Sequence, residues 1–316
     1  EPYRRQRQMC IRDSNLFYLD HELDIEQVWY SDTDNYLQLL ADEFDGACSI
    51  GIDKNFPARF LIPLMNLVDE CHFELGSECV DRVRMIKDEK EQQLMIEASK
   101  INDLVVDEVI NICAKGNLTE EEVSKQLEGI YQKHGCVGNS FEPIVAYGKN
   151  GADNHHSGDD SRLKAGDSIV IDIGGLYKGY CSDMTRTVFY KEVSPKQKTV
   201  YELVLKAQKA AEAMIKPGVR LCDIDKCARD IIAEGGYTVE FNHRLGHFIG
   251  RDVHEWCDVS QNFDLEVQEG MTFSIEPGVY LQGEFGVRIE DLVLVTKDGC
   301  KVLNSYPKDL RIIGND

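Results

Sequence analysis

Residues 167–189, DSIVIDIGGLYKGYCSDMTRTVF, decide the fold of this chain. Residues 167–173 form an apolar run that predicts a strand, and residues 182–189 predict a strand that returns beside it. Gly174, Gly175 and Gly179 lie between the two runs and permit the chain to reverse. The expected hairpin brings Asp172 and Asp183 together.

Asp172 stands inside an otherwise apolar run, where an unpaired carboxylate facing inward would cost several kcal/mol. For a lone Asp the default expectation is that it faces solvent from an edge strand. Asp183 on the returning strand makes that alternative less persuasive, because a second acid beside the first indicates a shared site.

Three further residues extend the set. His247 lies within HRLGHFIG at residues 243–250, Glu276 follows an apolar run, and Glu290 ends the alternating run of residues 286–290. Each alone is a weak signal, since a Glu in a strand is usually solvated. Four acids sharing one pocket with one imidazole would raise each other's pKa, and two divalent cations would cancel the four negative charges. The set is typical of a two-metal hydrolase.

Composition bounds the class of protein. The chain has 316 residues, 42% hydrophobic content and a net charge of -21. It has no apolar run long enough to span a bilayer, so we expect a soluble protein with no membrane partner and with one large core or two unequal ones. The acidic charge argues against nucleic acid as a partner and suits small peptides. Eleven cysteines without a CxxC pair are expected to be free thiols in a reducing cytoplasm.

The first fourteen residues differ from the rest. Residues 4–13, RRQRQMCIRD, resemble the in-frame translation of an adapter used to prepare DNA sequencing libraries. A natural basic arm is the alternative. We interpret residues 1–14 as a non-native segment and expect the natural chain to begin earlier, with its first segment missing here.

The remaining sequence predicts two domains. In residues 15–83, apolar runs at 16–19, 28–30 and 49–52 alternate with helix-like stretches at 36–44 and 58–68. This pattern is typical of a small α/β domain. A long amphipathic helix follows residue 88, so the second domain is expected to cover residues 84–316.

The second domain contains a weak internal repeat. A long helix ends near residue 115, and Thr119 with Glu122 forms a capping box for a second helix that runs to residue 135. Ser194 with Gln197 opens another long helix, and a further helix is expected over residues 222–235. Strands with part of the ligand set follow each pair, which predicts two similar halves that face each other across a site.

These motifs resemble those of the metallopeptidase family that contains methionine aminopeptidase, aminopeptidase P and prolidase. The resemblance covers residues from about 84 to the C-terminus, and the preceding segment resembles a creatinase-type N-terminal domain. It implies an α+β fold, the pita-bread fold, with an internal pseudo-two-fold repeat after a partial α/β domain. It also implies two divalent metal ions per chain and a homodimer.

The resemblance implies a role for each site residue. Asp172, Asp183 and Glu290 would be held by or shared between the ions, with His247 and Glu276 completing the set, and Glu276 would accept a proton from the water between the ions. His254 would steady the oxyanion, His155 would contact the substrate near the scissile bond, and His243 would line the pocket for the residue after that bond. A solvated role stays open for His155, which adjoins His156 in a polar loop.

Arg288 has two readings from its residue type. It either pairs with a site carboxylate or binds the free carboxylate of a dipeptide in bidentate fashion.

Two residues depart from the family pattern. Asn154 precedes His155 where proline is frequent, and Phe248 follows His247 where glycine is common. Both departures favour a narrower substrate pocket.

The expected activity is hydrolysis of Xaa-Pro bonds, first of all in dipeptides. One histidine with four acids favours manganese, cobalt, zinc or iron, and manganese is the first expectation. An Xaa-Pro aminopeptidase that acts on longer peptides is the alternative, and methionine aminopeptidase is disfavoured by the creatinase-like domain. A protein of the same fold that binds peptides without cleaving them is the remaining alternative, but it should have replaced at least one of the five ligands.

Overall fold

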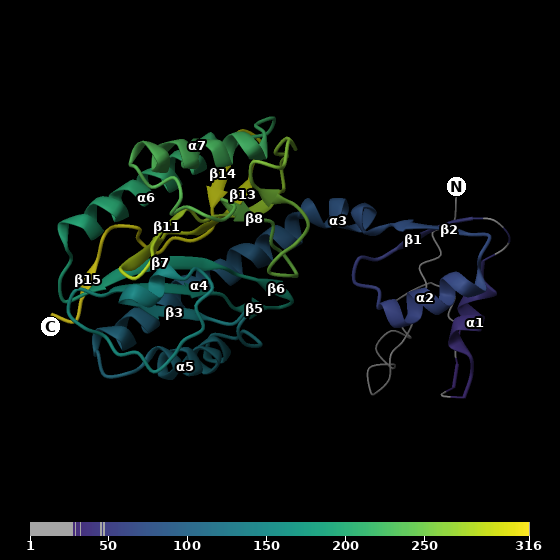
Figure 1. Ribbon diagram of the computed structural model, residues 1–316, viewed down its shortest axis with the longest axis horizontal. Helices are drawn as coiled ribbons and strands as arrows, with labels where there is room; N and C mark the ends of the chain where they lie inside the picture. The colour runs from purple at the N-terminus through teal and green to yellow at the C-terminus, as the bar shows by residue number, and fades with distance from the viewer. Residues whose placement is uncertain (1–27, 29, 32, 45, 47, 316) are drawn as a thin grey trace. The chain divides into compact units, whose positions relative to one another are not determined.

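The computed structural model describes residues 28, 30, 31, 33–44, 46 and 48–315 (Figure 1). The chain divides into two compact units, residues 1–77 and 78–316. The adapter-like residues 1–14 and the apolar run 16–19 lie outside the described residues. The observed division falls at Ser77, and the expected assignment of residues 15–83 and 84–316 to two functional domains stays a prediction.

The described part of the first unit is a β–α–β arrangement. Strands β1 (Ser49–Ile52) and β2 (His72–Leu75) pair in parallel, and helix α2 (Ala58–Leu67) connects them. Helix α1 (Tyr36–Ala41) precedes β1. Val28 and Tyr30 form no strand, contrary to the pattern of residues 28–30.

The second unit contains two helix pairs that begin where the sequence predicts. After α3 (Ser77–Met85), the long helix α4 (Glu89–Ala114) precedes α5 (Glu120–Lys133), and α5 has the expected capping box between Thr119 and Glu122. The second pair is α6 (Pro195–Met214) with α7 (Leu221–Glu234), and the box between Ser194 and Gln197 opens α6. In each box the side chain of the first residue accepts a hydrogen bond from the backbone N–H of the second, and the side chain of the second accepts one from the backbone N–H of the first.

A four-stranded sheet follows the first helix pair, in the order β15-β7-β4-β3. Strands β4 and β7 are antiparallel, with Asp172 opposite Thr185. The alternative that Asp172 faces solvent from an edge strand is therefore wrong, because β4 has a neighbour on each side. The strands are β3 (Ile144–Tyr147), β4 (Ser168–Ile173), β7 (Met184–Tyr190) and β15 (Ile312–Ile313), and the short hairpin of β5 (Leu176–Tyr177) and β6 (Tyr180–Cys181) connects β4 to β7.

The second half has a three-stranded sheet in the order β10-β13-β14 and a hairpin of β11 and β12. A two-stranded ladder of β8 and β9 precedes them. The strands are β8 (Gly246–His247), β9 (Asp258–Val259), β10 (Thr272–Ile275), β11 (Gly278–Leu281), β12 (Phe285–Arg288), β13 (Asp291–Val295) and β14 (Cys300–Val302).

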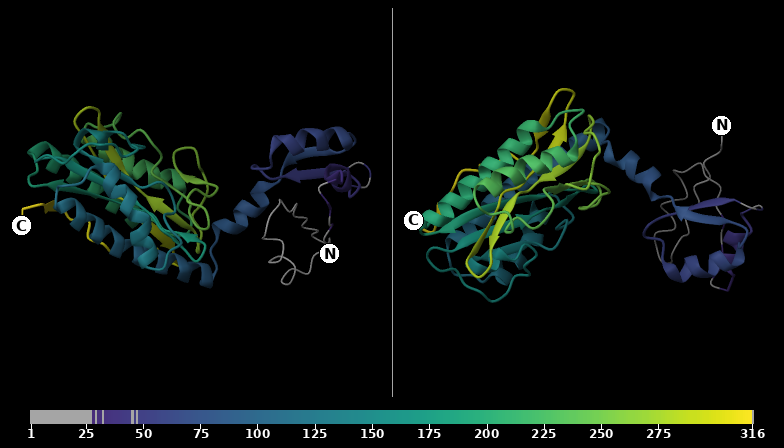
Figure 2. Two further views of the ribbon diagram at one scale, coloured as in Figure 1. Left: turned by 90° about the horizontal axis from the view of Figure 1, so that it is seen from below. Right: turned by 45° about the horizontal axis from the view of Figure 1, so that its top comes forward.

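The strands of the second unit lie between the two helix pairs. Helices α6 and α7 cover one side and α4 and α5 the other, as Figures 1 and 2 show from three directions. One apolar core packs α6 and α7 against β10–β13, and another packs α4 and α5 against β3, β4 and β7. Every residue of β7 is buried, with Phe189 in the first core and Val188 in the second. This strand therefore joins the two halves.

The halves also meet through two glycines, which yields a testable prediction. A Cβ atom added to Gly286 on β12 would lie 1.7 Å from the carbonyl oxygen of Gly151 in the short helix η2 (Gly148–Ala152). We expect Gly286→Ala to lower the free energy of unfolding by about 1–3 kcal/mol, because the backbones must separate. Urea unfolding followed by circular dichroism measures this change.

Gly129→Ala is the matched control. Gly129 lies on the exposed face of α5, and a Cβ there meets nothing within 4 Å. The control should gain about 0.5–1 kcal/mol from helix propensity. Equal stability of Gly286→Ala and the wild type would contradict the close contact between the two halves.

Candidate active site

Two acids come from the first half. Asp172 lies on β4 and Asp183 directly precedes β7. The β4–β7 register pairs Ile173 with Met184, so the two acids lie at the same end of the hairpin. Both side chains are largely buried, at 13% exposure for Asp172 and 6% for Asp183. The hairpin that the sequence predicts thus delivers both carboxylates to one place.

The second half supplies the other three residues. His247 lies on β8, Glu276 lies between β10 and β11, and Glu290 lies between β12 and β13. His247 Nε2 is 3.4 Å from Asp183 Oδ2 and 3.6 Å from Glu276 Oε1. Glu290 Oε2 accepts a 2.7 Å hydrogen bond from the Thr185 hydroxyl of the first half. The five expected ligands therefore converge from both halves.

All nine residues singled out from the sequence line one cavity of about 640 Å³. They are Asp172, Asp183, His247, Glu276, Glu290, His155, His243, His254 and Arg288. The cavity also has an apolar part, formed by Phe141, Ile144 and Val253.

The donor atoms of the site fit divalent cations. Asp183, His247 and Glu290 each offer an atom within 4.8 Å of the other two. Asp172 Oδ1, Asp183 Oδ1 and Glu290 Oε1 are buried and accept no hydrogen bond from any residue that the structure describes. Leaving a charged oxygen in that state is costly unless a cation binds it. His247 Nδ1–H donates to the carbonyl of Phe248 at 3.3 Å, which leaves the lone pair of Nε2 free for a metal.

The electrostatics of the site show the same need for cations. Burial and the nearby Asp172 raise the pKa of Asp183 well above its usual value. Burial and the charges of Asp183 and Glu276 do the same to the pKa of Glu290. Burial raises the pKa of Glu276 to about 7, and burial lowers the pKa of His247. Without cations, the pocket disfavours the charged form of each of these four groups.

Arg288 takes the first of its two expected roles in this structure. Its Nη2 donates to Asp172 Oδ2 at 2.5 Å, its Nη1 to the Tyr280 hydroxyl at 2.8 Å, and its Nε to Thr185 at 3.0 Å. The side chain is 3% exposed. It therefore fixes Asp172, and binding of a substrate carboxylate by the same guanidinium stays a prediction.

His243 forms the next link of the same chain of hydrogen bonds. Its Nδ1–H donates to the carbonyl of Arg244 at 2.6 Å, and its Nε2 accepts from the Tyr280 hydroxyl at 3.0 Å. Burial and the charge of Arg288 lower its pKa to about 3. His243 is therefore a neutral, immobilised part of the cavity wall.

The two remaining histidines are more accessible. His254 packs edge-on against His247, with 4.4 Å between the ring centroids, and burial lowers its pKa to about 4. His155 is an exposed residue of the cavity wall, and its backbone N–H donates to Asp153 Oδ1. Neighbouring His156 instead pairs with the buried Glu120. A substrate that enters the cavity can thus contact both His155 and His254.

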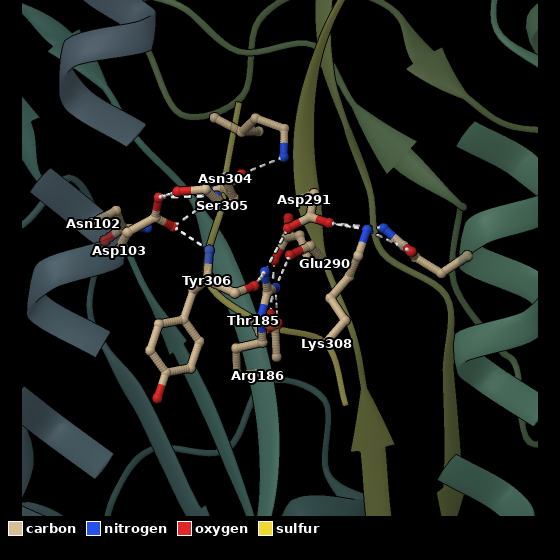
Figure 3. A network of polar contacts seen from close by, with 12 residues as sticks. Asn102, Asp103, Thr185, Arg186, Glu290, Asp291, Asn304, Ser305, Tyr306 and Lys308 are labelled. Carbon is tan, nitrogen blue, oxygen red and sulfur yellow. Dashed lines mark hydrogen bonds and ion pairs between the residues drawn. The ribbon is translucent and has the colours of Figure 1, made fainter. Parts of the chain in front are cut away.

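A second layer of charges lies behind Glu290. The guanidinium of Arg186 donates to the backbone carbonyl of Glu290 at 2.6 Å and to Asp291 Oδ1 at 2.7 Å, and Asp291 also pairs with Lys308 (Figure 3). Arg186 and Asp291 are buried. The network fixes the backbone on the C-terminal side of Glu290 and thereby restrains the direction of its carboxylate.

Several residues of the site were not identified from the sequence. Tyr280 bridges Arg288 and His243, Thr185 bonds Glu290, and the Ser274 hydroxyl donates to Glu276 at 3.2 Å. Two of them carried a usable signal. Thr185 and Ser274 each lie two positions from a ligand along an extended segment, and side chains at that spacing share a face.

Comparisons with known proteins agree with this geometry. Residues 93–297 match the model of metallopeptidase family M24. The chain is 45% identical over 241 residues to the putative dipeptidase YkvY of Bacillus subtilis, which covers 76% of this chain and 66% of that protein. It is 40% identical over 273 residues to an Xaa-Pro dipeptidase of Pyrococcus horikoshii, which covers 85% and 78%. The crystal structure of a prolidase from Thermococcus sibiricus superposes with a TM-score of 0.89 at 34% identity and covers 94% and 82%.

The fold and the cluster of carboxylates define a metal-dependent hydrolase. The chain belongs to metallopeptidase family M24. The predicted pita-bread fold is confirmed by the solved relatives. The chain spans about two thirds of the Bacillus protein.

The raised pKa values predict how the stability of the metal-free protein depends on pH. A carboxyl with a raised folded-state pKa keeps a proton that the unfolded chain releases, so stability falls as the pH rises from the ordinary value through the folded value. For Glu276 this window runs from 4.5 to about 7, a shift equivalent to about 3 kcal/mol. His243, His247 and His254, with lowered pKa values, have the opposite slope, but their effect is complete above pH 6.5. From pH 6.5 upward we expect the melting temperature of the chelated protein to fall.

The variant Asp183→Asn should melt higher than the chelated wild type at pH 8, because it removes one buried like charge. Differential scanning calorimetry on chelated samples measures the difference. Asp230→Asn, on the exposed part of α7, should leave the profile unchanged. A melting temperature of Asp183→Asn below that of the wild type at pH 8 would contradict the assignment of Asp183 to the group of buried carboxylates that repel each other.

Proposed function

We propose that this metallopeptidase hydrolyses Xaa-Pro peptide bonds and acts mainly on dipeptides. The observation that carries the proposal is the set of three buried carboxylate oxygens, on Asp172, Asp183 and Glu290, that have no hydrogen-bond partner in the described part of the chain. These residues line a cavity whose wall also includes apolar side chains, which can pack against a proline ring. The dipeptidase and prolidase names of the relatives support the same substrate class.

Asp172, Asp183, His247, Glu276 and Glu290 would hold two divalent cations. When bound, such ions acidify water and polarise a peptide carbonyl. Glu276 Oε1, which accepts from Ser274, takes the proton from the attacking water and returns it to the leaving nitrogen. His254 donates a hydrogen bond to the oxygen of the former carbonyl as negative charge develops on it.

The specificity for proline follows from the leaving nitrogen. In an Xaa-Pro bond this nitrogen belongs to the pyrrolidine ring and carries no hydrogen, so the enzyme gains nothing from a group that would accept an N–H. Phe141, Ile144 and Val253 instead offer apolar surface for the ring, and His243 lines the same cavity. His155 contacts the substrate near the scissile bond. Arg288 orients Asp172, and contact between Arg288 and the dipeptide carboxylate is the finer part of the proposal.

We also propose manganese as the metal, since four carboxylates and one imidazole suit a hard first-row ion.

The charge of -21 supports the absence of a nucleic-acid partner. Among the described residues, no helix is both long and apolar enough to cross a bilayer. We also propose that the protein forms a homodimer and is located in the cytoplasm. The resemblance of the first unit to a domain that contributes to dimers supports the homodimer, and the ten cysteines among the described residues, all free thiols, support the compartment.

A substrate panel tests the activity. Protein stripped by a chelator and resupplied with manganese should cleave Xaa-Pro dipeptides with a kcat/KM about 10-fold or more above that for Xaa-Pro-Yaa tripeptides. The matched Xaa-Ala dipeptides should be poor substrates. Preference for the tripeptides would instead identify an Xaa-Pro aminopeptidase. Failure to cleave any Xaa-Pro peptide with manganese, cobalt, zinc or iron would overturn the proposal.

Replacement of Glu276 tests its role in proton transfer. Glu276→Gln should lower kcat by about 10²–10⁴-fold, because an amide cannot accept the proton. Circular dichroism should show an intact fold. Glu284→Gln is the matched control, since Glu284 lies exposed in the β11–β12 turn. Glu276 would lose its assigned role if its variant retained wild-type turnover.

A further inference from the structure

The loop that carries His155 is bound to a buried carboxylate from another element. Glu120, the first residue of α5, has 0% exposure. Its Oε2 accepts a 2.7 Å hydrogen bond from His156 Nε2 and a 3.1 Å bond from the backbone N–H of Asp159. Two residues of the loop 153–161 are therefore held by one oxygen atom, and one of them adjoins His155.

The other oxygen of Glu120 holds the segment before the loop. Oε1 accepts from the backbone N–H of Tyr147 at 2.6 Å and from the Asn150 side chain at 3.0 Å. Both segments that flank His155 thus converge on the same carboxylate. A carboxylate without exposure is tolerated only with such pairing, and the start of a helix adds favourable backbone dipoles.

The contacts distinguish Glu120 from a metal ligand. Glu120, His156 and Asp159 lie close enough together to suggest a second cation site. Both Glu120 oxygens, however, already accept two donors each. The carboxylates of the active site differ, because each of three keeps an oxygen without a donor. Glu120 therefore holds protein groups in place.

The backbone fit of the loop against α5 is close. The N–H of Glu120 donates to Ser161 O, and the N–H of Glu121 donates to Asp159 O. A Cβ atom added to Gly158 would lie 3.3 Å from the backbone of Glu120 and Glu121. The loop thus follows the start of α5, and a change at Glu120 moves the support on which His155 rests.

The second accessible histidine has an equivalent support. His254 is followed by Glu255, whose carboxylate pairs with the buried Lys87 at 2.8 Å and with Arg84 at 2.6 Å. In both loops, the residue after the cavity histidine is thus held by a polar side-chain contact outside the loop, to Glu120 of α5 in one loop and to Lys87 and to Arg84 of α3 in the other. The recurrence favours a positioning role for these pairs.

We infer that Glu120 is a positioning residue for His155 and acts through His156. This inference rests on the proposed function, in which His155 contacts the substrate. Glu120 itself lies outside the residues that line the cavity.

A double-mutant cycle on the manganese-loaded enzyme tests the inference. Glu120→Gln should lower kcat for an Xaa-Pro dipeptide by about 10–100-fold, the range typical of supporting residues. In the His155→Ala background the same substitution should have no further effect, because the group that it positions is gone. Glu121→Gln, exposed on the same helix turn, should match the wild type. An equal fold-loss in both backgrounds would overturn the inference.

Two substitutions of His156 keep the test decisive if Glu120→Gln fails to fold. His156→Gln retains a donor toward Glu120 and should keep near wild-type kcat, whereas His156→Phe should lose as much as Glu120→Gln. Equal activity of the two variants would contradict a role for the hydrogen bond.

Limited proteolysis gives a measurement that does not depend on catalysis. Cleavage within residues 153–161, mapped by mass spectrometry, should be at least 10-fold faster in Glu120→Gln or His156→Phe than in the wild type. An unchanged rate of proteolysis within the loop would overturn the inference, whether or not the wild-type enzyme hydrolyses Xaa-Pro peptides. A wild-type enzyme that hydrolyses no Xaa-Pro peptide would reject only the proposed function.

Discussion

The structure depends on one electrostatic constraint: four carboxylates must keep their negative charge while they share one largely buried pocket. The chain meets this constraint partly with its own cations and donors. Arg288 pairs with Asp172, Thr185 bonds Glu290, and Ser274 bonds Glu276. These partners bind one oxygen of each of these three acids, and Asp172 and Glu290 each keep a second buried oxygen that accepts no hydrogen bond from the described residues. The buried acids are thus held in a high-energy arrangement by the packing of both halves.

Because the ligands come from both halves of the second unit, the site forms only when both halves are folded and packed together. Asp172 and Asp183 belong to the sheet under α4 and α5, whereas His247, Glu276 and Glu290 belong to the strands under α6 and α7. Strand β7 and the glycine contact of β12 with η2 fix the distance between the two sets. Behind them, the network of Arg186, Asp291 and Lys308 fixes the backbone direction at Glu290 (Figure 3). Precision at the site therefore comes from contacts several residues away from it.

Local features were predictable from the sequence because their causes are local. The capping boxes at Thr119 and Ser194 involve residues three apart, and the Asp172–Asp183 hairpin needs only two apolar runs with glycines between them. The choice between the two roles of Arg288 was not predictable, since it depends on how β12 lies against β4. The pairs of Glu120 with His156 and of Arg186 with Asp291 were also hidden, because their partners lie 36 and 105 positions apart. The roles of the histidines came from family resemblance, and spacing alone would not have supplied them.

The bond between Thr185 and Glu290 also bears on how the protein is made. Its two residues are 105 positions apart, so a ribosome adding 5–20 residues per second needs roughly 5–20 s to synthesise the second after the first. During that interval the nascent chain presents Asp172 and Asp183 without the residues that complete the site. A cation that requires all five side chains can therefore bind only after Glu290 has been synthesised.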